Sequence, residues 1–227
     1  MKGIKAILID IDNTLLDFYE SAKYAVGVAF GKVGLDYNEH CFKVFTEQND
    51  LLWQKIECGE LTRQGLHQIR FKIIFDVLNL NGNDLKAEEE FRKALFNVAV
   101  AVDGAKDLVE HLAKKYKLYC ASNAIYNQQI NRLKLAGMHD NFEDFFISER
   151  IGYQKPTKEF FDYCFSQMGG ICPSETIMIG DSLTADITGA KKYGIKSIWY
   201  NHLKKENDSD IFPDFSVDSL SQIKKIL

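Results

Sequence analysis

The stretch that decides the fold reads Ile-Lys-Ala-Ile-Leu-Ile-Asp-Ile-Asp-Asn-Thr and covers residues 4–14. Its first six residues form a mostly apolar run without strict alternation, which is typical of a strand covered on both faces. The run then ends in two carboxylates, Asp10 and Asp12, and Thr14 follows them. A buried strand that ends in a polar cluster predicts a functional site at the end of that strand.

Strand and helix patterns alternate through the second half of the chain. Short apolar runs predict strands at residues 117–121, 145–148, 176–179 and 197–200. Helical patterns lie between them, around residues 130–136, from Pro156 onward and over residues 184–193. This alternation predicts a parallel sheet with helices on both faces. The first strand must join that sheet, because an isolated strand cannot satisfy its own backbone groups.

The middle of the chain has a different character. Long amphipathic stretches predict helices at residues 24–33, 42–56, 63–80 and 88–96. Because this block separates the first strand from the rest of its sheet, it is interpreted as an insertion. The predicted fold class is α/β, a Rossmann-like parallel sheet core with an inserted helical cap domain. Residues 1–17 and 101–227 form the core in this prediction, and residues 18–100 form the cap.

Composition excludes several classes of function. The 227 residues carry 28 Lys and Arg against 32 Asp and Glu, and no long basic run would follow a nucleic-acid polymer. The apolar run of residues 6–9 is too short for a secretory signal or a membrane span. The five cysteines contain no Cys-x-x-Cys pair, which favours free thiols. We therefore expect a cytoplasmic protein with no membrane partner, and infer no obligate protein partner.

Four polar clusters lie at predicted strand ends or helix starts. They are Asp10 with Asp12 and Thr14, Ser122 with Asn123, Lys155, and Asp181 followed by Asp186. Carboxylates gathered at one place repel each other unless a cation lies between them. Mg²⁺ fits, because it prefers hard oxygen ligands and also binds substrate phosphate. Together the clusters predict a phosphoryl-transfer site with Mg²⁺ as cofactor.

Each polar group has a role in such a reaction. Asp10 is the candidate nucleophile, since a metal would screen its charge from an anionic ester. Asp12 is the candidate general acid and base. Hydroxyl, amide and ammonium donors would then bind the phosphoryl oxygens, where transition-state charge is spread. These candidate phosphate-binding donors are Thr14, Ser122, Asn123 and Lys155.

In order and spacing, the four clusters resemble the motifs of the haloacid dehalogenase superfamily, and the match spans nearly the whole chain. The resemblance implies the same nucleophile and acid/base, with Ser122 and Lys155 as phosphate binders. It implies that the metal ligands are Asp10, the backbone carbonyl of Asp12, and Asp181, with Asp186 supporting them from outside the ligand set.

Two further features bear on the substrate. The dehalogenases that give the superfamily its name lack an aspartate at the position of Asp12, which favours a phosphate ester here. Residues 52–62, continuing to Arg70-Phe71, resemble the noncanonical pyrimidine nucleotidases of the superfamily. That resemblance implies a nucleoside 5'-monophosphate substrate with a preference for pyrimidines. Ala124 and Thr157 depart from the residues common among relatives, without removing a catalytic group.

Alternatives stay open at this point. The substrate could be a sugar phosphate or another small phosphorylated metabolite, and the protein could be a dehalogenase or an inactive binding protein of the same fold. In the predicted cap, Trp53, Phe71 and Phe75 are interpreted as packing residues. Arg70 could equally address a sugar or base or lie on a solvated helix face.

Overall fold

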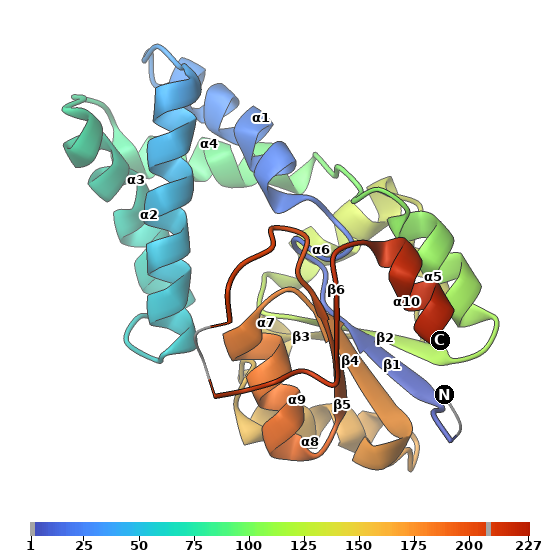
Figure 1. The fold of residues 1–227 in the computed structure, drawn as a ribbon. Helices are drawn as coiled ribbons and strands as arrows, with labels where there is room; N and C mark the ends of the chain where they lie inside the picture. The colour runs from blue at the N-terminus through green and yellow to red at the C-terminus, as the bar shows by residue number, and fades with distance from the viewer. Residues whose placement is uncertain (1–2, 208–209) are drawn as a thin grey trace. The chain divides into compact units, whose positions relative to one another are not determined.

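The first strand, β1 (Ala6–Ile9), lies in the interior of a parallel sheet, between β2 and β4 (Figure 1). The computed structural model describes residues 3–207 and 210–227. Within them the sheet has six strands in the order β3-β2-β1-β4-β5-β6. The other strands are β2 (Lys117–Ser122), β3 (Asp144–Ile147), β4 (Thr176–Gly180), β5 (Lys196–Tyr200) and β6 (Phe215–Val217). The chain leaves β1 and returns to pair with it only at β2.

Side chains alternate between the two faces of this sheet, and each face has its own apolar core. Ile7 and Ile9 of β1 belong to one cluster, which also includes residues of α5 (Ala105–Ala113) and α10 (Leu220–Ile226). Leu8 belongs to the other cluster, with residues of α8 (Lys158–Gln167) and α9 (Thr188–Tyr193). Burial on both faces explains why β1 reads as an unbroken apolar run.

Shorter helical segments complete this unit. They are α6 (Tyr126–Leu135), α7 (Ser148–Ile151), the 3₁₀ turns η1 (His139–Asn141) and η2 (Pro173–Glu175), and a π-helical turn, η3 (Leu183–Ile187). By its contacts, the chain divides into two compact units. One contains residues 1–17 and 99–227, and the other contains residues 18–98.

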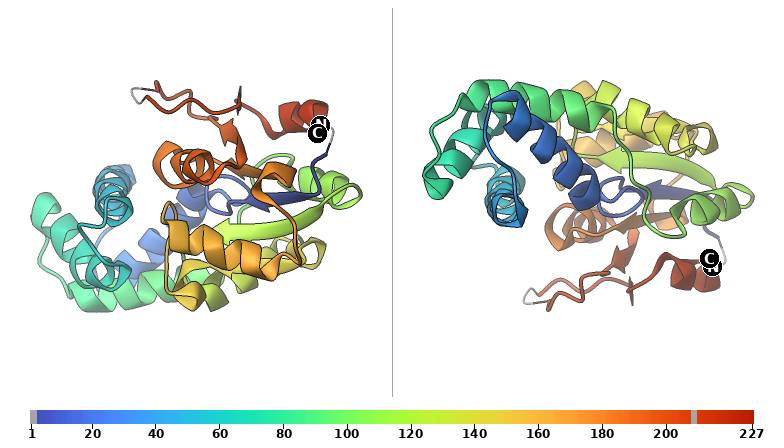
Figure 2. Two further views of the ribbon diagram at one scale, coloured as in Figure 1. Left: turned by 90° about the horizontal axis from the view of Figure 1, so that it is seen from below. Right: turned by 90° about the horizontal axis from the view of Figure 1, so that it is seen from above.

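The inserted unit consists of four helices that pack against one another, visible in the blue-to-green part of Figure 2. They are α1 (Phe18–Lys32), α2 (Glu39–Glu57), α3 (Arg63–Leu78) and α4 (Asp84–Phe96). The side chains of Asn38, Thr62 and Asn83 accept backbone N–H groups at the starts of α2, α3 and α4. Such caps satisfy donors that a helix start leaves without an intrahelical partner.

Arg70 ties three of these helices together. Its guanidinium donates to both carboxylate oxygens of Glu88 on α4 (3.0 and 2.7 Å) and to Oδ1 of Asn49 on α2 (3.0 Å). It also lies over the ring of Phe91, 4.4 Å from the centroid. Only 4% of Arg70 is exposed. Arg70 is therefore an internal structural residue, which corrects the expectation that it addresses a substrate or lies on a solvated face.

The predicted fold class, a Rossmann-like parallel sheet with an inserted helical domain, is confirmed. Phe71 and Phe75 are buried in the apolar cluster of the helical unit, and Trp53 packs on a smaller cluster there, so the packing interpretation of all three is confirmed. The helix predicted from Pro156 begins only at Lys158, because the extended backbone of Thr157 caps it (φ −64°, ψ 147°).

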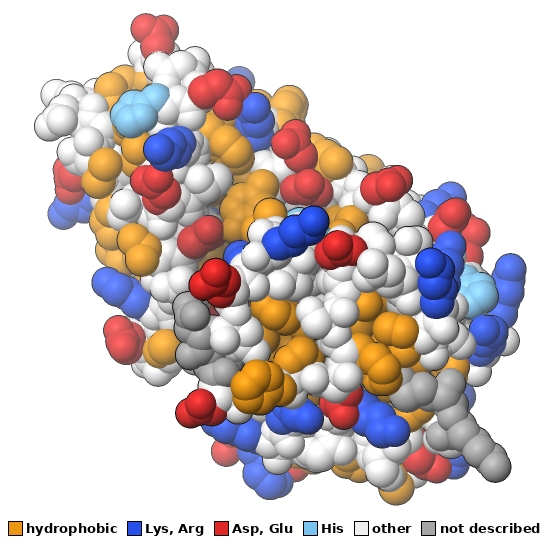
Figure 3. Space-filling view, in the orientation of Figure 1, with side chains coloured by type: hydrophobic (Ala, Val, Ile, Leu, Met, Phe, Trp, Pro, Cys, Tyr) orange, Lys and Arg blue, Asp and Glu red, His pale blue; other side chains and the backbone are white. Residues whose placement is uncertain are grey.

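The surface carries charges of both signs (Figure 3). No helix within residues 3–207 and 210–227 is both long enough and apolar enough to cross a bilayer. On the face presented in Figure 3, Lys and Arg side chains are interspersed with Asp and Glu and do not gather in one basic patch. All five cysteines are free thiols.

Removing the partner of Arg70 should destabilise the helical unit. We expect Glu88→Ala to lower the free energy of unfolding by about 3–5 kcal/mol, because it leaves a buried guanidinium without its carboxylate. Glu89→Ala on the same helix removes an exposed carboxylate and should change stability little. Chemical denaturation of the two variants measures both effects. Equal stability of the two variants would show that the buried pair is not needed.

Candidate active site

A tight turn follows β1 and carries the predicted carboxylates. The backbone N–H of Asp10 donates to the carbonyl oxygen of Ile179 (2.9 Å), which continues the pairing of β1 with β4. The N–H of Asn13 donates to the carbonyl oxygen of Leu16 (2.6 Å), and the N–H of Leu16 to that of Ile11 (2.8 Å). Asn13 has φ 58°, a region that asparagine tolerates better than most residues. The turn thereby fixes the backbone of the catalytic candidates.

Lys155 lies at the centre of the site. Its Nζ donates to Asp10 Oδ1 (2.7 Å), to Asp186 Oδ1 (2.6 Å) and to the carbonyl oxygen of Ala121 (2.6 Å). An ammonium has three donors, and here all three are used. Lys155 is 1% exposed and Asp186 is 1% exposed, so this is a buried ion cluster with matched partners.

Asn123 holds the backbone of Lys155 in place. Its Nδ2 donates to the carbonyl oxygen of Lys155 (2.9 Å), and its Oδ1 accepts the N–H of Lys155 (2.8 Å). This reciprocal pair connects the end of β2 with the segment before α8, 32 residues apart. The structure thus gives Asn123 a positioning role, while its direct contact with a phosphate stays a prediction.

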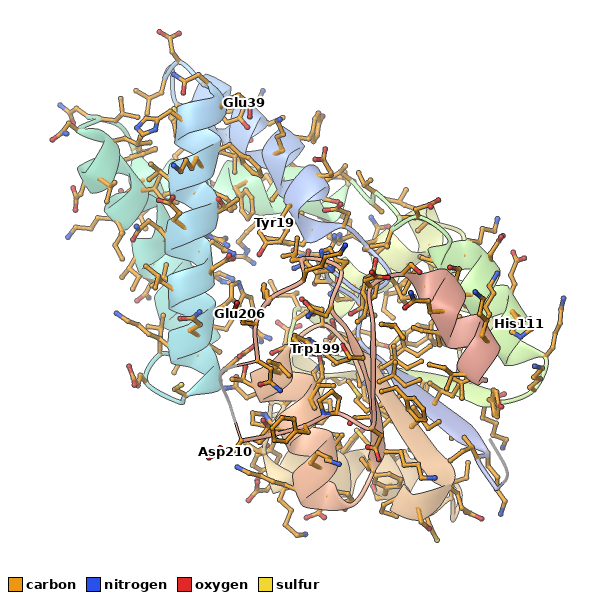
Figure 4. The ribbon with its side chains drawn as sticks, in the orientation of Figure 1. Tyr19, Glu39, His111, Trp199, Glu206 and Asp210 are labelled. Atoms are coloured by element: carbon orange, nitrogen blue, oxygen red, sulfur yellow. The ribbon has the colours of Figure 1, made fainter. Side chains whose placement is uncertain are left out.

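The segment that follows β4, including η3, supplies the rest of the acidic cluster. Carboxylate oxygens of Asp10, Asp181 and Asp186 lie within 4.8 Å of one another. Asp186 Oδ2 also accepts the N–H of Ser182 (3.1 Å). Trp199 on β5, labelled in Figure 4, donates its indole N–H to the carbonyl oxygen of Asp181 (2.9 Å). The carboxylate of Asp186 and the backbone of Asp181 are therefore each fixed by a hydrogen bond within the core unit.

A side chain at position 180 would disrupt this arrangement. A Cβ placed on Gly180 would overlap the carboxylate of Asp186, so only glycine lets Asp186 approach the end of β4 this closely. The close approach of Asp186 therefore requires glycine at position 180.

The carboxylates of the cluster carry more charge than Lys155 can compensate. Burial raises the pKa of Asp10 to about 7, against the opposing charge of Lys155. Burial, with the negative charges of Asp10 and Asp186, raises the pKa of Asp181 well above its usual value. The pKa of Lys155 is raised because the two carboxylates outweigh the effect of its burial. One ammonium does not compensate for three crowded carboxylates.

A divalent cation fits this environment. Among the described residues, the Asp181 carboxylate accepts no hydrogen bond, whereas those of Asp10 and Asp186 accept from Lys155. Buried carboxylates without a donor are unfavourable unless they are paired, protonated or metal-bound. Hard carboxylate oxygens suit Mg²⁺ in particular. The residues present therefore fit the predicted metal.

Asp12 has partners that the sequence analysis missed. Gln129 Nε2 donates to Asp12 Oδ2 (2.6 Å), and Arg132 Nη1 donates to Asp12 Oδ1 (2.6 Å). Gln129 and Arg132 are fully buried on α6, whereas the Asp12 side chain is 30% exposed. The sequence carries no local signal for this contact, because Gln129 and Arg132 lie more than 110 residues from Asp12.

The two remaining candidates are both buried. Ser122, 2% exposed, ends β2, and its Oγ accepts a hydrogen bond from Gln129 (3.2 Å). Thr14 is fully buried, and its Oγ1 has no hydrogen-bond partner among the described residues. The structure thus brings Ser122 into the network around Asp12, and phosphate binding by either hydroxyl stays a prediction.

The architecture and the site define an α/β protein that gathers carboxylates and one lysine at the carboxyl ends of parallel strands. A family model described as haloacid dehalogenase-like hydrolase matches residues 4–194. The chain therefore belongs to the haloacid dehalogenase-like hydrolase family, as the motif order predicted.

Individual relatives match over nearly the full length. The chain is 31% identical to the HAD-hydrolase YfnB of Bacillus subtilis, covering 100% of this chain and 97% of that protein. The magnesium-bound crystal structure of YfnB superposes with a TM-score of 0.94, at 30% identity and 98% coverage of both chains.

Other relatives carry substrate names. Identity is 32% to the pyrimidine 5'-nucleotidase PynA of Streptococcus pneumoniae, over 96% of this chain and 93% of that one. Identity is 28% to the pyrimidine 5'-nucleotidase YjjG of Escherichia coli, over 97% of this chain and 96% of that one. A glyceraldehyde 3-phosphate phosphatase of Methanothermobacter thermautotrophicus also matches, at 26% over 99% of this chain and 100% of that one.

The raised pKa values predict how pH and metal together affect stability. A carboxyl whose folded pKa exceeds its unfolded pKa loses stabilisation as pH rises from the unfolded value, near 3.8, through the folded value, which is about 7 for Asp10. Without metal, stability should fall across this window. Because Mg²⁺ binds deprotonated carboxylates, saturating Mg²⁺ should raise the melting temperature more at pH 8 than at pH 5.

Differential scanning fluorimetry with EDTA or Mg²⁺ at the two pH values makes this measurement. Asp181→Asn should remove most of the Mg²⁺ effect at pH 8. Asp107→Asn, which changes an exposed carboxylate on α5, should retain it. An equal Mg²⁺ effect at both pH values, or none in the unsubstituted protein, would contradict the assignment of the metal to this cluster.

Proposed function

We propose that this chain is a Mg²⁺-dependent phosphomonoester hydrolase that forms an aspartyl-phosphate on Asp10. The observation that carries the proposal is the cluster of buried Asp10, Lys155 and Asp186 with half-buried Asp181, beside the partly exposed Asp12. A carboxylate nucleophile, a fixed cation and a metal-binding set are the parts that phosphoryl transfer to aspartate needs. Membership of a hydrolase family supports the same conclusion.

The first half of the proposed reaction transfers the phosphoryl group from the substrate to Asp10. A carboxylate oxygen of Asp10 attacks phosphorus and forms the new P–O bond, while the bond from phosphorus to the leaving oxygen breaks. Asp12 gives its proton to that leaving oxygen, which departs as an alcohol. The products of this half are the free alcohol, an acyl phosphate on Asp10 and the Asp12 carboxylate.

The second half restores the protein. Asp12 takes a proton from water, whose oxygen attacks phosphorus, and the bond between phosphorus and the Asp10 oxygen breaks. Inorganic phosphate leaves, Asp10 is again a carboxylate, and Asp12 is again protonated. Asp12 recovers in the second half the proton that it gave in the first, so the enzyme is unchanged after one turnover.

Asp10, Asp181 and the backbone carbonyl of Asp12 would hold Mg²⁺. When bound, the ion would screen the carboxylates from the phosphate charge. Asp186 supports this set from the side, because its oxygens accept from Lys155 and Ser182. Lys155 uses all three donors within the protein, so in the free enzyme it acts through its charge.

The proposed substrate class is a nucleoside 5'-monophosphate with a pyrimidine base. Two full-length relatives named pyrimidine 5'-nucleotidases support it, as does the resemblance of residues 52–62 to that group. In this proposal residues 18–100 form the cap that selects the substrate, and residues 1–17 and 101–227 form the catalytic core. The alternative, a sugar phosphate, is favoured by the relative that is a glyceraldehyde 3-phosphate phosphatase.

The remaining alternatives have less support. A dehalogenase would not need a carboxylate at position 12, and an inactive binding protein would not need the intact cluster around Lys155. Five free thiols favour a reducing compartment such as the cytoplasm. We infer a small phosphorylated metabolite as the partner, without a nucleic-acid polymer.

The nucleophile and the metal can be tested by turnover. With a nitrophenyl phosphate and Mg²⁺, Asp10→Asn should lower kcat by at least about a thousandfold, because it removes the attacking group. EDTA should abolish turnover, and added Mg²⁺ should restore it. Asp107→Asn is the matched control and should keep full activity. Unchanged turnover by Asp10→Asn would refute the assigned nucleophile.

A substrate panel tests the proposed class. We expect kcat/KM for pyrimidine nucleoside 5'-monophosphates to exceed that for purine nucleotides and for triose and hexose phosphates. Phosphate release from each compound at equal concentration measures this order. If sugar phosphates were hydrolysed as well as or better than the pyrimidine nucleotides, the nucleotidase assignment would fail while the phosphatase mechanism would stand.

A further inference from the structure

Two buried side chains on one face of α6 converge on the carboxylate of Asp12. Arg132 Nη1 donates to one oxygen and Gln129 Nε2 donates to the other, each at 2.6 Å. Neither donor residue is exposed. They are three positions apart on α6, so both lie on the same side of that helix. More than 110 residues of sequence separate them from Asp12.

The network also fixes the Gln129 amide. Arg132 Nη1 donates to Gln129 Oε1 (3.1 Å), which leaves the amide nitrogen facing Asp12. The same nitrogen lies 3.2 Å from Ser122 Oγ. Because Arg132 orients Gln129 and Gln129 contacts two site residues, the pair acts as one unit. We call Gln129 and Arg132 the α6 clamp.

We propose that the α6 clamp positions Asp12 for proton transfer to the leaving oxygen. This inference rests on the proposed function, in which Asp12 is the general acid. An aspartate on a partly exposed loop can otherwise occupy several rotamers, and most of them would misplace the proton. Each carboxylate oxygen accepts one hydrogen bond from the clamp, which leaves a further lone pair on each oxygen for the proton.

A purely structural role makes a different prediction. If the clamp only anchored α6 to the turn after β1, its loss would lower stability and reduce activity toward every substrate alike. A positioning role instead makes the loss depend on how much protonation the leaving group needs. Nitrophenolate leaves readily without a proton, whereas an alkoxide requires one. The leaving group therefore separates the two roles.

The experiment compares Gln129→Met and Arg132→Met on a series of phosphate monoesters, from nitrophenyl through phenyl to an alkyl ester such as a nucleoside 5'-monophosphate. General acid catalysis contributes about a hundredfold or more. We expect kcat/KM to fall by less than about threefold for nitrophenyl phosphate and by at least about thirtyfold for the alkyl ester. Asp12→Asn should show the same trend, only larger.

Matched variants on α6 serve as controls. Lys134→Met changes an exposed residue and should leave the whole series unchanged. Leu133→Ala removes buried apolar contacts and should lower stability without a trend across the leaving groups. In the double variant, adding Arg132→Met to Asp12→Asn should cost little further activity, because the clamp acts through Asp12.

The outcomes separate the two proposals. A uniform fall across the series, or none, in both clamp variants would overturn the inference even when Asp12→Asn shows the trend. No trend in Asp12→Asn itself would overturn the role of Asp12 as general acid, and the inference with it. If melting shows that Arg132→Met does not fold, Gln129→Met and Arg132→Lys decide the question by the same criterion.

Discussion

The buried ammonium of Lys155 is the interaction on which the rest of the site depends. It contacts Asp10 after β1, Asp186 after β4 and the carbonyl oxygen of Ala121 in β2, each within 2.7 Å. These three neighbouring strands are brought together by the sheet, and the lysine compensates part of the charge that converges where they end. The paired carboxylates alone would be too costly to bury, and the lysine alone would be too. The carboxylates and the lysine can therefore be buried only together.

The cluster still carries more negative than positive charge, and that excess favours the binding of a divalent cation. Asp181 has no donor of its own among the described residues, and its pKa is raised by burial and by its acidic neighbours. The neighbouring carboxylate of Asp186 is held by Lys155 and Ser182, and the backbone carbonyl of Asp181 accepts from Trp199. The charge and the oxygen ligands around Asp181 therefore fit a divalent cation. Asp12 lies outside this carboxylate cluster. It is partly exposed and is held separately by a side chain of α6.

Much of this could be predicted from the sequence, for physical reasons. Strands buried on both faces read as apolar runs, and polar clusters at their ends mark the site, so β1 and the four motifs were recognisable. β6 was missed because it has three residues, of which Phe215 and Ser216 are exposed, and it pairs only with β5. The clamp residues and the Arg70–Glu88 pair were missed because each depends on a partner in another element, which local pattern does not specify.

The most direct test of the central claim is chemical identification of the phosphorylated residue. Enzyme quenched in acid during turnover would be reduced with borohydride, which converts an aspartyl-phosphate to homoserine, and the peptides would be sequenced by mass spectrometry. The account predicts homoserine at position 10 and nowhere else. Phosphate release without modification of Asp10, or modification of a different residue, would contradict it.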